Sequence, residues 1–191
     1  MTELIFILLQ FFIIYFVLSF NIRILSYKFN NQLSFTSIEN ICFNTIVLLN
    51  IILFLSFFEI NLQTIINIYF FYMLVLIMFY ISKYKQIVLF DKSKIFRLIV
   101  FFLISIIFFT EVANNLIIFW DAGKFWIYKT LNFYNGNTLA NLSNLPNSWY
   151  PYLGSLVWAF FWKISLLENE YSGRLFYVFF YVSSLILIIK N

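Results

Sequence analysis

The hydrophobic pattern divides the chain into six apolar runs separated by shorter polar segments. A helix needs roughly 20 predominantly apolar residues to cross a hydrocarbon core of about 30 Å, and several runs approach or exceed that length. We therefore predict an all-α fold, a multi-pass transmembrane helical bundle of about six membrane helices. The predicted spans are residues 4–20, 41–58, 65–81, 98–120, 152–167 and 175–189.

Charged residues between the runs predict how the bundle is oriented. The most basic loop follows the third run and carries Lys83, Lys85, Lys92, Lys94 and Arg97 against Asp91. Short basic loops stay on the cytoplasmic side of a membrane. Alternation then places the N-terminus, the turn at Glu59 and the end of the fourth run outside, in the plasma or inner membrane. The link 168–174 is expected on the inner side.

A polar loop separates the fourth and fifth predicted spans. It opens with an aromatic, lysine-bearing stretch, 122–134, of the kind that commonly lies in the membrane interface. A turn at 135–137 leads into a polar segment that holds both prolines, Pro146 and Pro151. We expect an interfacial helix followed by an outer loop, residues 121–152 in all.

Composition agrees with a single membrane domain, residues 1–191, because 63% of the residues are hydrophobic and only 10% are charged. We divide it into an N-terminal three-helix part, 1–97, and a second part, 98–191, that contains the outer loop. The formal charge of +4 is scattered among loops that flank the predicted spans, which argues against nucleic acid as a partner.

The residue types that are missing narrow the chemistry. The chain has no histidine and a single cysteine, Cys42, which lies inside an apolar run. An intrachain disulfide, a thiolate metal cluster, His-ligated zinc and any histidine-based triad are therefore excluded. We predict no metal site, and carboxylates are left as the candidates for acid–base chemistry.

Asp121 stands at the end of the fourth run and has two interpretations. A carboxylate at a helix start commonly accepts backbone N–H bonds as an N-cap. Alternatively, the carboxylate acts as a general base on an acceptor hydroxyl. The second interpretation is favoured by an aromatic belt, Trp120 and Trp126, and by two nearby cations, Lys124 and Lys129.

Glu111 is an acid within an apolar run, and an ionisable residue in a membrane helix is a functional candidate by default. It precedes Asp121 by ten residues, about 15 Å along a helix, so the two acids are not expected to act as a close pair. Asn114 and Asn115 follow Glu111 at positions i+3 and i+4. Hydrogen bonds between these side chains would make a plain helix-packing cluster, which stays open as an alternative.

The remaining charged residues also have two readings each. Lys124 and Lys129 could compensate a phosphate, although interfacial lysines more often snorkel to lipid headgroups. Glu168, Glu170 and Arg174 are expected to form cap and salt-bridge contacts on the side opposite Asp121.

The second half of the chain contains several short motifs in a distinctive order. An apolar run ends in WDAGKFWIYKTLNFYNG, a polar loop follows, and then come YPYLGSLVWAFFWKI and ENEYSGRLFYV. This order resembles the polytopic C-type glycosyltransferases, and more narrowly the bacterial dolichyl-phosphate-mannose-transferase-like proteins of family 39 and its relatives. The resemblance covers roughly residues 98–181.

The resemblance implies roles for individual residues. Asp121 matches the proposed catalytic base of the family, at the outer end of an early helix. Trp126 and Lys129 match the continuation W-x-x-K-A, with Thr130 in place of the usual alanine. The matches at the starts of the next two helices are Tyr150, Pro151, Tyr152, Asn169, Glu170, Arg174 and Leu175.

Two departures accompany the resemblance. Many relatives carry a second acidic residue directly after the aspartate, and this chain has Ala122 there. Relatives also continue through several further helices, whereas this sequence ends at Asn191, so we expect a partial chain.

The implied activity is transfer of a sugar from a polyprenyl-phosphate donor to a hydroxyl group of a glycan, lipid or protein acceptor at the outer membrane surface. Asp121 would be the general base. No cofactor is expected; a divalent cation would be compatible with the chemistry, but the sequence shows no ligand cluster for one. The residues expected to contact substrate are Lys124, Trp126, Lys129, Tyr150 and Glu111.

Two rival functions belong to other classes. A non-catalytic membrane subunit would tolerate substitution of Asp121. A transporter of lipid-linked precursors would be favoured by membrane location and by Glu111, but the sequence lacks the internal repeats and broken helices typical of many transporters.

Overall fold

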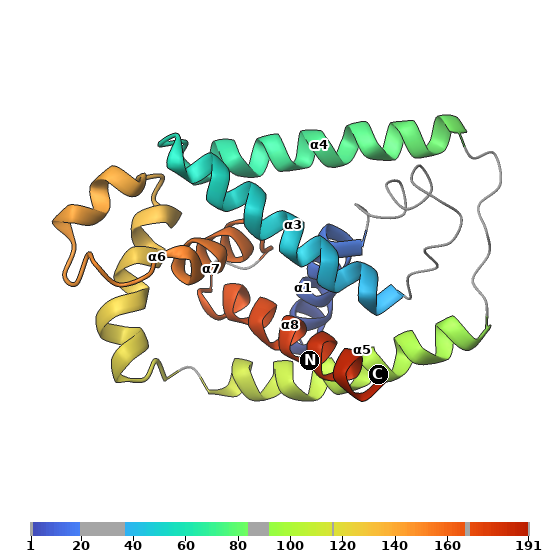
Figure 1. Ribbon diagram of the computed structural model, residues 1–191. Helices are drawn as coiled ribbons and strands as arrows, with labels where there is room; N and C mark the ends of the chain where they lie inside the picture. Colours follow the sequence, from blue (N-terminus) through green and yellow to red (C-terminus); the bar gives the residue numbers. More distant parts are fainter. Residues whose placement is uncertain (1, 20–36, 84–91, 116, 167–168, 191) are drawn as a thin grey trace.

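The computed structural model describes residues 2–19, 37–83, 92–115, 117–166 and 169–190 (Figure 1). Within these ranges the chain is helical and contains no strand, which confirms the all-α fold class. The elements are α1 (Thr2–Ser19), α3 (Ser37–Phe57), α4 (Leu62–Lys83), α5 (Lys92–Asn114), the π-helical turn η1 (Ala122–Trp126), α6 (Ile127–Tyr134), the 3₁₀ turn η2 (Leu139–Asn144), α7 (Leu153–Lys163) and α8 (Tyr171–Lys190). The basic loop from Tyr84 to Asp91 and the acid Glu168 lie outside the described residues.

Three of the described helices are long and apolar enough to cross a membrane. These segments are Ile38–Phe57 in α3, Leu62–Phe79 in α4 and Tyr171–Ile189 in α8. The apolar parts of α1 and α5, Leu4–Ser19 and Ile99–Asn114, are shorter. Helix length and composition therefore support a membrane protein, whereas the count of six spans and the orientation stay predictions.

The fifth predicted span differs most from its prediction. In the described part of this run, 152–166, the α-helix covers Leu153–Lys163, and these 11 residues rise about 16 Å, roughly half the thickness of a bilayer core. Every residue from Ser155 to Trp162 is buried. A helix that is apolar all round must be covered all round, and here α6, α8, α3 and α4 pack against it. Figure 1 shows α7 between α6 and α8.

The helices α6 and α7 run side by side in the same direction. Near their starts, Ser155 Oγ donates a hydrogen bond to the carbonyl of Trp126 at 3.0 Å. Near their ends, Lys163 Nζ donates to the carbonyl of Tyr134 at 3.1 Å. The predicted interfacial helix thus lies against α7 and buries part of its own length there; its placement in a membrane interface stays a prediction.

Several polar side chains inside the bundle donate hydrogen bonds to backbone carbonyls of neighbouring helices. Gln10 Nε2 donates to the carbonyls of Phe161 and Ser172, both at 3.2 Å, so α1 ties together the end of α7 and the start of α8. Tyr69 Oη donates to the carbonyl of Val17 in the last turn of α1 at 2.9 Å. The last four carbonyls of a helix lack partners within the helix, so the bonds to Phe161 and Val17 satisfy acceptors that would be costly to leave unpaired in apolar surroundings.

The start of α8 lies at the same end of the molecule as the end of α5. Arg174 Nη1 donates to the carbonyl of Asn115 at 3.5 Å, and Arg174 Nη2 pairs with Glu170 Oε1 at 2.7 Å. Glu170 and Arg174 therefore form the cap and salt-bridge contacts that were predicted for them. The prediction that they lie on the side opposite Asp121 is wrong, because Arg174 contacts the end of α5, six residues before Asp121. The reason is α7, which is too short to carry the chain across the bundle before α8 begins.

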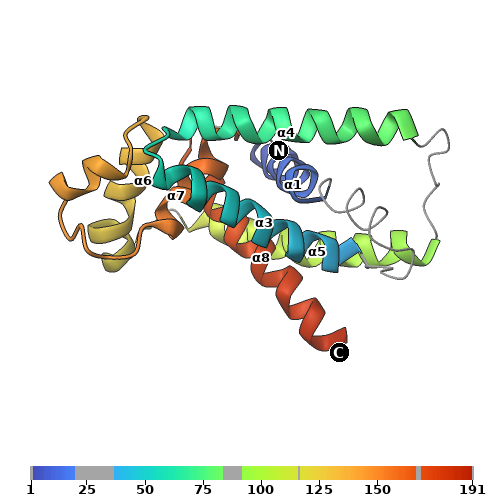
Figure 2. The same ribbon diagram turned by 45° about the horizontal axis from the view of Figure 1, so that its top comes forward.

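The turn between α3 and α4 reaches the polar loop that follows α6. Glu59 in this turn has a positive φ of 57°, and its Oε2 accepts a hydrogen bond from the backbone N–H of Ala140 at 2.9 Å. Figure 2 shows this turn beside the loop at one end of the molecule, with α3 and α4 diverging from it. The structure thus brings together two segments that the charge pattern predicts on one membrane face.

Candidate functional site

Asp121 lies in the first turn of a new helical segment and not at the end of the long helix that precedes it. The helix α5 ends at Asn114, none of the described residues from Asn115 to Phe119 is helical, and helix resumes at Trp120. Consecutive asparagines at the end of α5 account for the break, because their side chains compete with the backbone for hydrogen bonds. The new segment runs through η1 and α6 to Tyr134.

The Asp121 carboxylate is exposed and makes no capping contact. Its backbone is already helical, with φ −65° and ψ −46°, and its side chain makes no cap hydrogen bond. In the part of the chain that the structure describes, the carboxylate has neither a hydrogen bond nor an ion pair. The geometry therefore disfavours the N-cap interpretation and leaves an acceptor group free beside the positive end of a helix.

Lys124 lies three residues after Asp121, within the π-helical turn η1 that Asp121 precedes. Lys124 Nζ sits 4.4 Å from the ring centroid of Trp120, within cation–π range, and both side chains are exposed. The Trp120 ring in turn meets Phe125 edge-on at 5.7 Å. The result is a free carboxylate and an exposed, aromatic-supported ammonium group within one turn.

Lys129 occupies a different environment from Lys124. Its side chain is fully buried, and Nζ donates hydrogen bonds to the carbonyls of Tyr150, at 2.6 Å, and Ser148, at 3.4 Å. Burial lowers the pKa of the Lys129 ammonium group below its ordinary value. Lys129, which belongs to α6, thus holds the segment before α7 against α6 through these two hydrogen bonds.

The aromatic residues expected at the site lie around the hydrogen bond between Lys129 and Tyr150. The Tyr150 ring stacks on Phe125 with centroids 5.0 Å apart and 15° between the planes, and it meets Trp126 edge-on at 6.0 Å. Lys129 Nζ lies 5.9 Å from the ring centroids of both Trp126 and Tyr150. Trp149 beside them is 78% exposed, and its ring is tilted by 33° from that of Tyr150, so the cluster presents an exposed aromatic edge near the segment that follows Asp121.

Glu111 is exposed near the end of α5, and its carbonyl accepts the backbone N–H of Asn115 at 3.0 Å. In the described part of the chain, no side-chain hydrogen bond joins Glu111 to Asn114 or Asn115, so the helix-packing cluster is not formed. The helical spacing of ten residues between Glu111 and Asp121 no longer applies, because the helix breaks between them. A substrate contact by Glu111 stays a prediction.

Glu59 is a residue of this end of the molecule that sequence reasoning did not select. Hydrogen bonds from the Thr138 side chain and from the Ala140 N–H hold the pKa of its carboxyl below the ordinary value. Thr138 also forms a reciprocal capping box with Asn141 at the start of η2. The sequence signal for Glu59 was an acid in a short turn between two apolar runs. Its hydrogen-bond partner Ala140 lies 81 residues further along the chain, so the contact could not be predicted from local pattern.

The candidate site has no ligand set for a metal ion of its own. No group of three or more metal-binding side chains occurs among the described residues. A divalent cation at this site would therefore have to take most of its ligands from substrate phosphate and water.

No protein-family model matches the chain, and neither the comparison with curated proteins nor the comparison with solved structures found a match. The family resemblance therefore stays an expectation that rests on short motifs and their order.

Proposed function

We propose that the chain is part of a membrane glycosyltransferase that moves a sugar from a polyprenyl-phosphate donor to an acceptor hydroxyl. The observation that carries the proposal is the free, exposed Asp121 carboxylate, three residues before the exposed Lys124 in the same helical segment. In this reading the end of the molecule that holds Asp121 faces the outer side of the plasma or inner membrane. The long apolar helices form the membrane bundle and enclose α7, and the segment 122–134 lies at its interface.

Sugar transfer from a polyprenyl-phosphate donor requires one general base. Asp121 takes the proton of the acceptor hydroxyl while the acceptor oxygen bonds to the anomeric carbon. The bond from that carbon to the phosphate oxygen breaks, with inversion, and its electron pair leaves with polyprenyl phosphate. Because phosphate is already a good leaving group, no second carboxylate is needed as a general acid, in contrast to ordinary glycoside hydrolysis.

Lys124 is a better candidate than Lys129 for binding the phosphate of the departing polyprenyl phosphate. It is exposed, and its charge is not neutralised by an ion pair with any described residue. Lys129 is buried and already donates to two carbonyls, so its contribution is to hold Tyr150 beside Trp126. These rings offer the stacking surface on which a sugar face or the first isoprene units can rest.

A transfer assay tests the proposal. Membranes that contain the full-length protein receive a polyprenyl-phosphate sugar with a labelled sugar, and release of polyprenyl phosphate is measured. The proposal predicts release with the unchanged protein and its loss with Asp121→Asn. Release that is unaffected by Asp121→Asn would overturn the assigned role.

A non-catalytic membrane subunit is the second candidate, and the openness of the site favours it. Asp121, Lys124 and Trp120 are all exposed, which suits a surface that a partner subunit covers. This candidate predicts that Asp121→Asn leaves sugar transfer intact while changing which proteins co-purify with the chain.

A further inference from the structure

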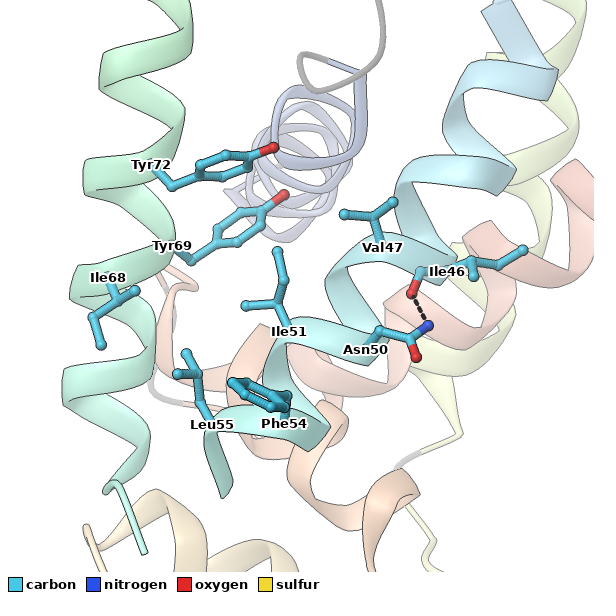
Figure 3. Close-up of a pocket in the computed structure, with 9 residues that line it drawn as sticks. All are labelled: Ile46, Val47, Asn50, Ile51, Phe54, Leu55, Ile68, Tyr69 and Tyr72. Carbon is cyan, nitrogen blue, oxygen red and sulfur yellow. Dashed lines mark hydrogen bonds between the residues drawn. The ribbon is translucent and has the colours of Figure 1, made fainter. Parts of the chain in front are cut away.

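An apolar cleft of about 700 Å³ lies between α3 and α4. Figure 3 shows side chains of both helices facing it, with Tyr69 and Tyr72 extending from α4 and Val47, Ile51 and Leu55 from α3. Tyr69 is fully buried, whereas Ile46 and Phe54 at the edge are 54% and 62% exposed. The cleft therefore has a buried floor and an open rim.

Both walls of the cleft belong to helices of membrane-spanning length. On α3 it extends from Ile46 to Leu55, within the segment Ile38–Phe57, and on α4 from Ile68 to Tyr72, within Leu62–Phe79. If these helices cross a bilayer, the cleft opens at the depth of the hydrocarbon core, where water does not fill it. An occupant has to come from the membrane.

The polar groups of the lining are few and mostly bonded within the protein. The Asn50 amide donates to the carbonyl of Ile46 in its own helix at 2.7 Å, and the Tyr69 hydroxyl donates to the carbonyl of Val17. The cleft consequently offers apolar contact and little else, which excludes a headgroup or a charged ligand at this depth.

The size of the cleft selects between two apolar occupants. A helix about 10 Å across fills roughly 1,300 Å³ in three turns, nearly twice the cleft. A flexible hydrocarbon chain is far narrower, and the cleft falls within the range of about 300–1,000 Å³ that is usual for small-molecule sites. We propose that this cleft binds one hydrocarbon chain of a membrane lipid. The proposal does not depend on the chemistry of Asp121.

Native mass spectrometry of the full chain tests this binding site. The protein is reconstituted in dioleoyl phosphatidylcholine vesicles, extracted in mild detergent and measured for retained lipid. Val47→Trp fills the cleft from α3, and Leu74→Trp is the matched control, because Leu74 is 58% exposed and lies on the opposite face of α4. The expected result is one phospholipid retained by the wild type and the control, and loss of most of it from Val47→Trp.

A second variant guards against misfolding of the first. Ile46→Trp places the same bulk at the open rim, where 54% exposure leaves room for it, and should also lose the lipid. Equal lipid retention by all variants, or a wild type without lipid, would overturn the proposal. So would efficient disulfide cross-linking of two Ile46→Cys chains in the vesicles, because it would place a second copy in the cleft.

Discussion

Lys129 Nζ donates a hydrogen bond to the carbonyl of Tyr150 at 2.6 Å, and this contact fixes the candidate site's aromatic wall. Lys129 belongs to α6, whereas Tyr150 belongs to the polar segment just before α7. The contact therefore joins the two ends of a loop more than 20 residues apart, and the stacking of Tyr150 on Phe125 depends on it.

Replacing Lys129 by methionine should loosen this loop. The change keeps the apolar stem but leaves the carbonyls of Ser148 and Tyr150 without their donor, at a cost of about 1–3 kcal/mol. Chemical denaturation in detergent should show a lower free energy of unfolding. Lys124→Met is the control, and because Lys124 is exposed it should change stability by less than about 0.5 kcal/mol. Equal effects of the two substitutions would contradict the fastening role.

The hydrogen bonds between Glu59 and the start of η2 should weaken at low pH. The pKa of its carboxyl is lowered from 4.5 by hydrogen bonds from the Thr138 side chain and the Ala140 N–H. A lowered pKa means that the stabilising contribution is present above 4.5 and is lost as the pH falls through the folded value. Hydrogen exchange at the Ala140 amide should be faster in Glu59→Gln than in the wild type at pH 7, and the difference should fade in acid.

The neighbouring Asn61 provides a control for that measurement. Its Oδ1 accepts the backbone N–H of Thr64 at 2.9 Å and caps the start of α4. Asn61→Ala should destabilise α4 without changing the exchange at Ala140. A difference between Glu59→Gln and the wild type that persists undiminished in acid would contradict the assignment.

Gly173 should tolerate no larger residue, because α7 and α8 touch there. An added Cβ would clash with the carbonyl oxygen of Trp158 and lie 2.5 Å from its Cδ1. Overpacking of this kind costs about 1–3 kcal/mol or more, so Gly173→Ala should lower thermal stability measurably. Gly154→Ala is the matched control on α7, since its Cβ would meet only Tyr177 Oη at 3.7 Å. Similar melting temperatures for both variants would show that the helices do not pack this closely.

The sequence predicts the helices well and their packing poorly. Apolar runs mark where helices form, but the run around Trp158 could not be told from a membrane span, because a helix buried in protein and one buried in lipid have the same pattern. The break after Asn114 was hidden by the apolar residues that follow it. Charge counting predicted the turn at Glu59 and the loop 121–152 on one membrane face, and the hydrogen bond from the Ala140 N–H to Glu59 joins these two segments, while the membrane orientation stays a prediction.

The candidate site was predictable only as far as it is local. Asp121 and Lys124 are three residues apart in the sequence, so both fall within one turn wherever this stretch is helical. Lys129 and Glu59 bond to backbone groups 21 and 81 residues away. A backbone partner cannot be predicted from the residue type at its position. Arg174 was expected on the other side because the length of α7 was unknown.

The rate of sugar transfer with Asp121→Asn tests the central claim most directly. Membranes with the full-length protein and a polyprenyl-phosphate sugar are compared with the variant and with Asn144→Ala, an exposed amide of the same loop. Loss of a general base should lower the initial rate by about 10²–10⁴-fold, with Asn144→Ala close to wild type. A rate for Asp121→Asn within a few-fold of wild type would contradict the account.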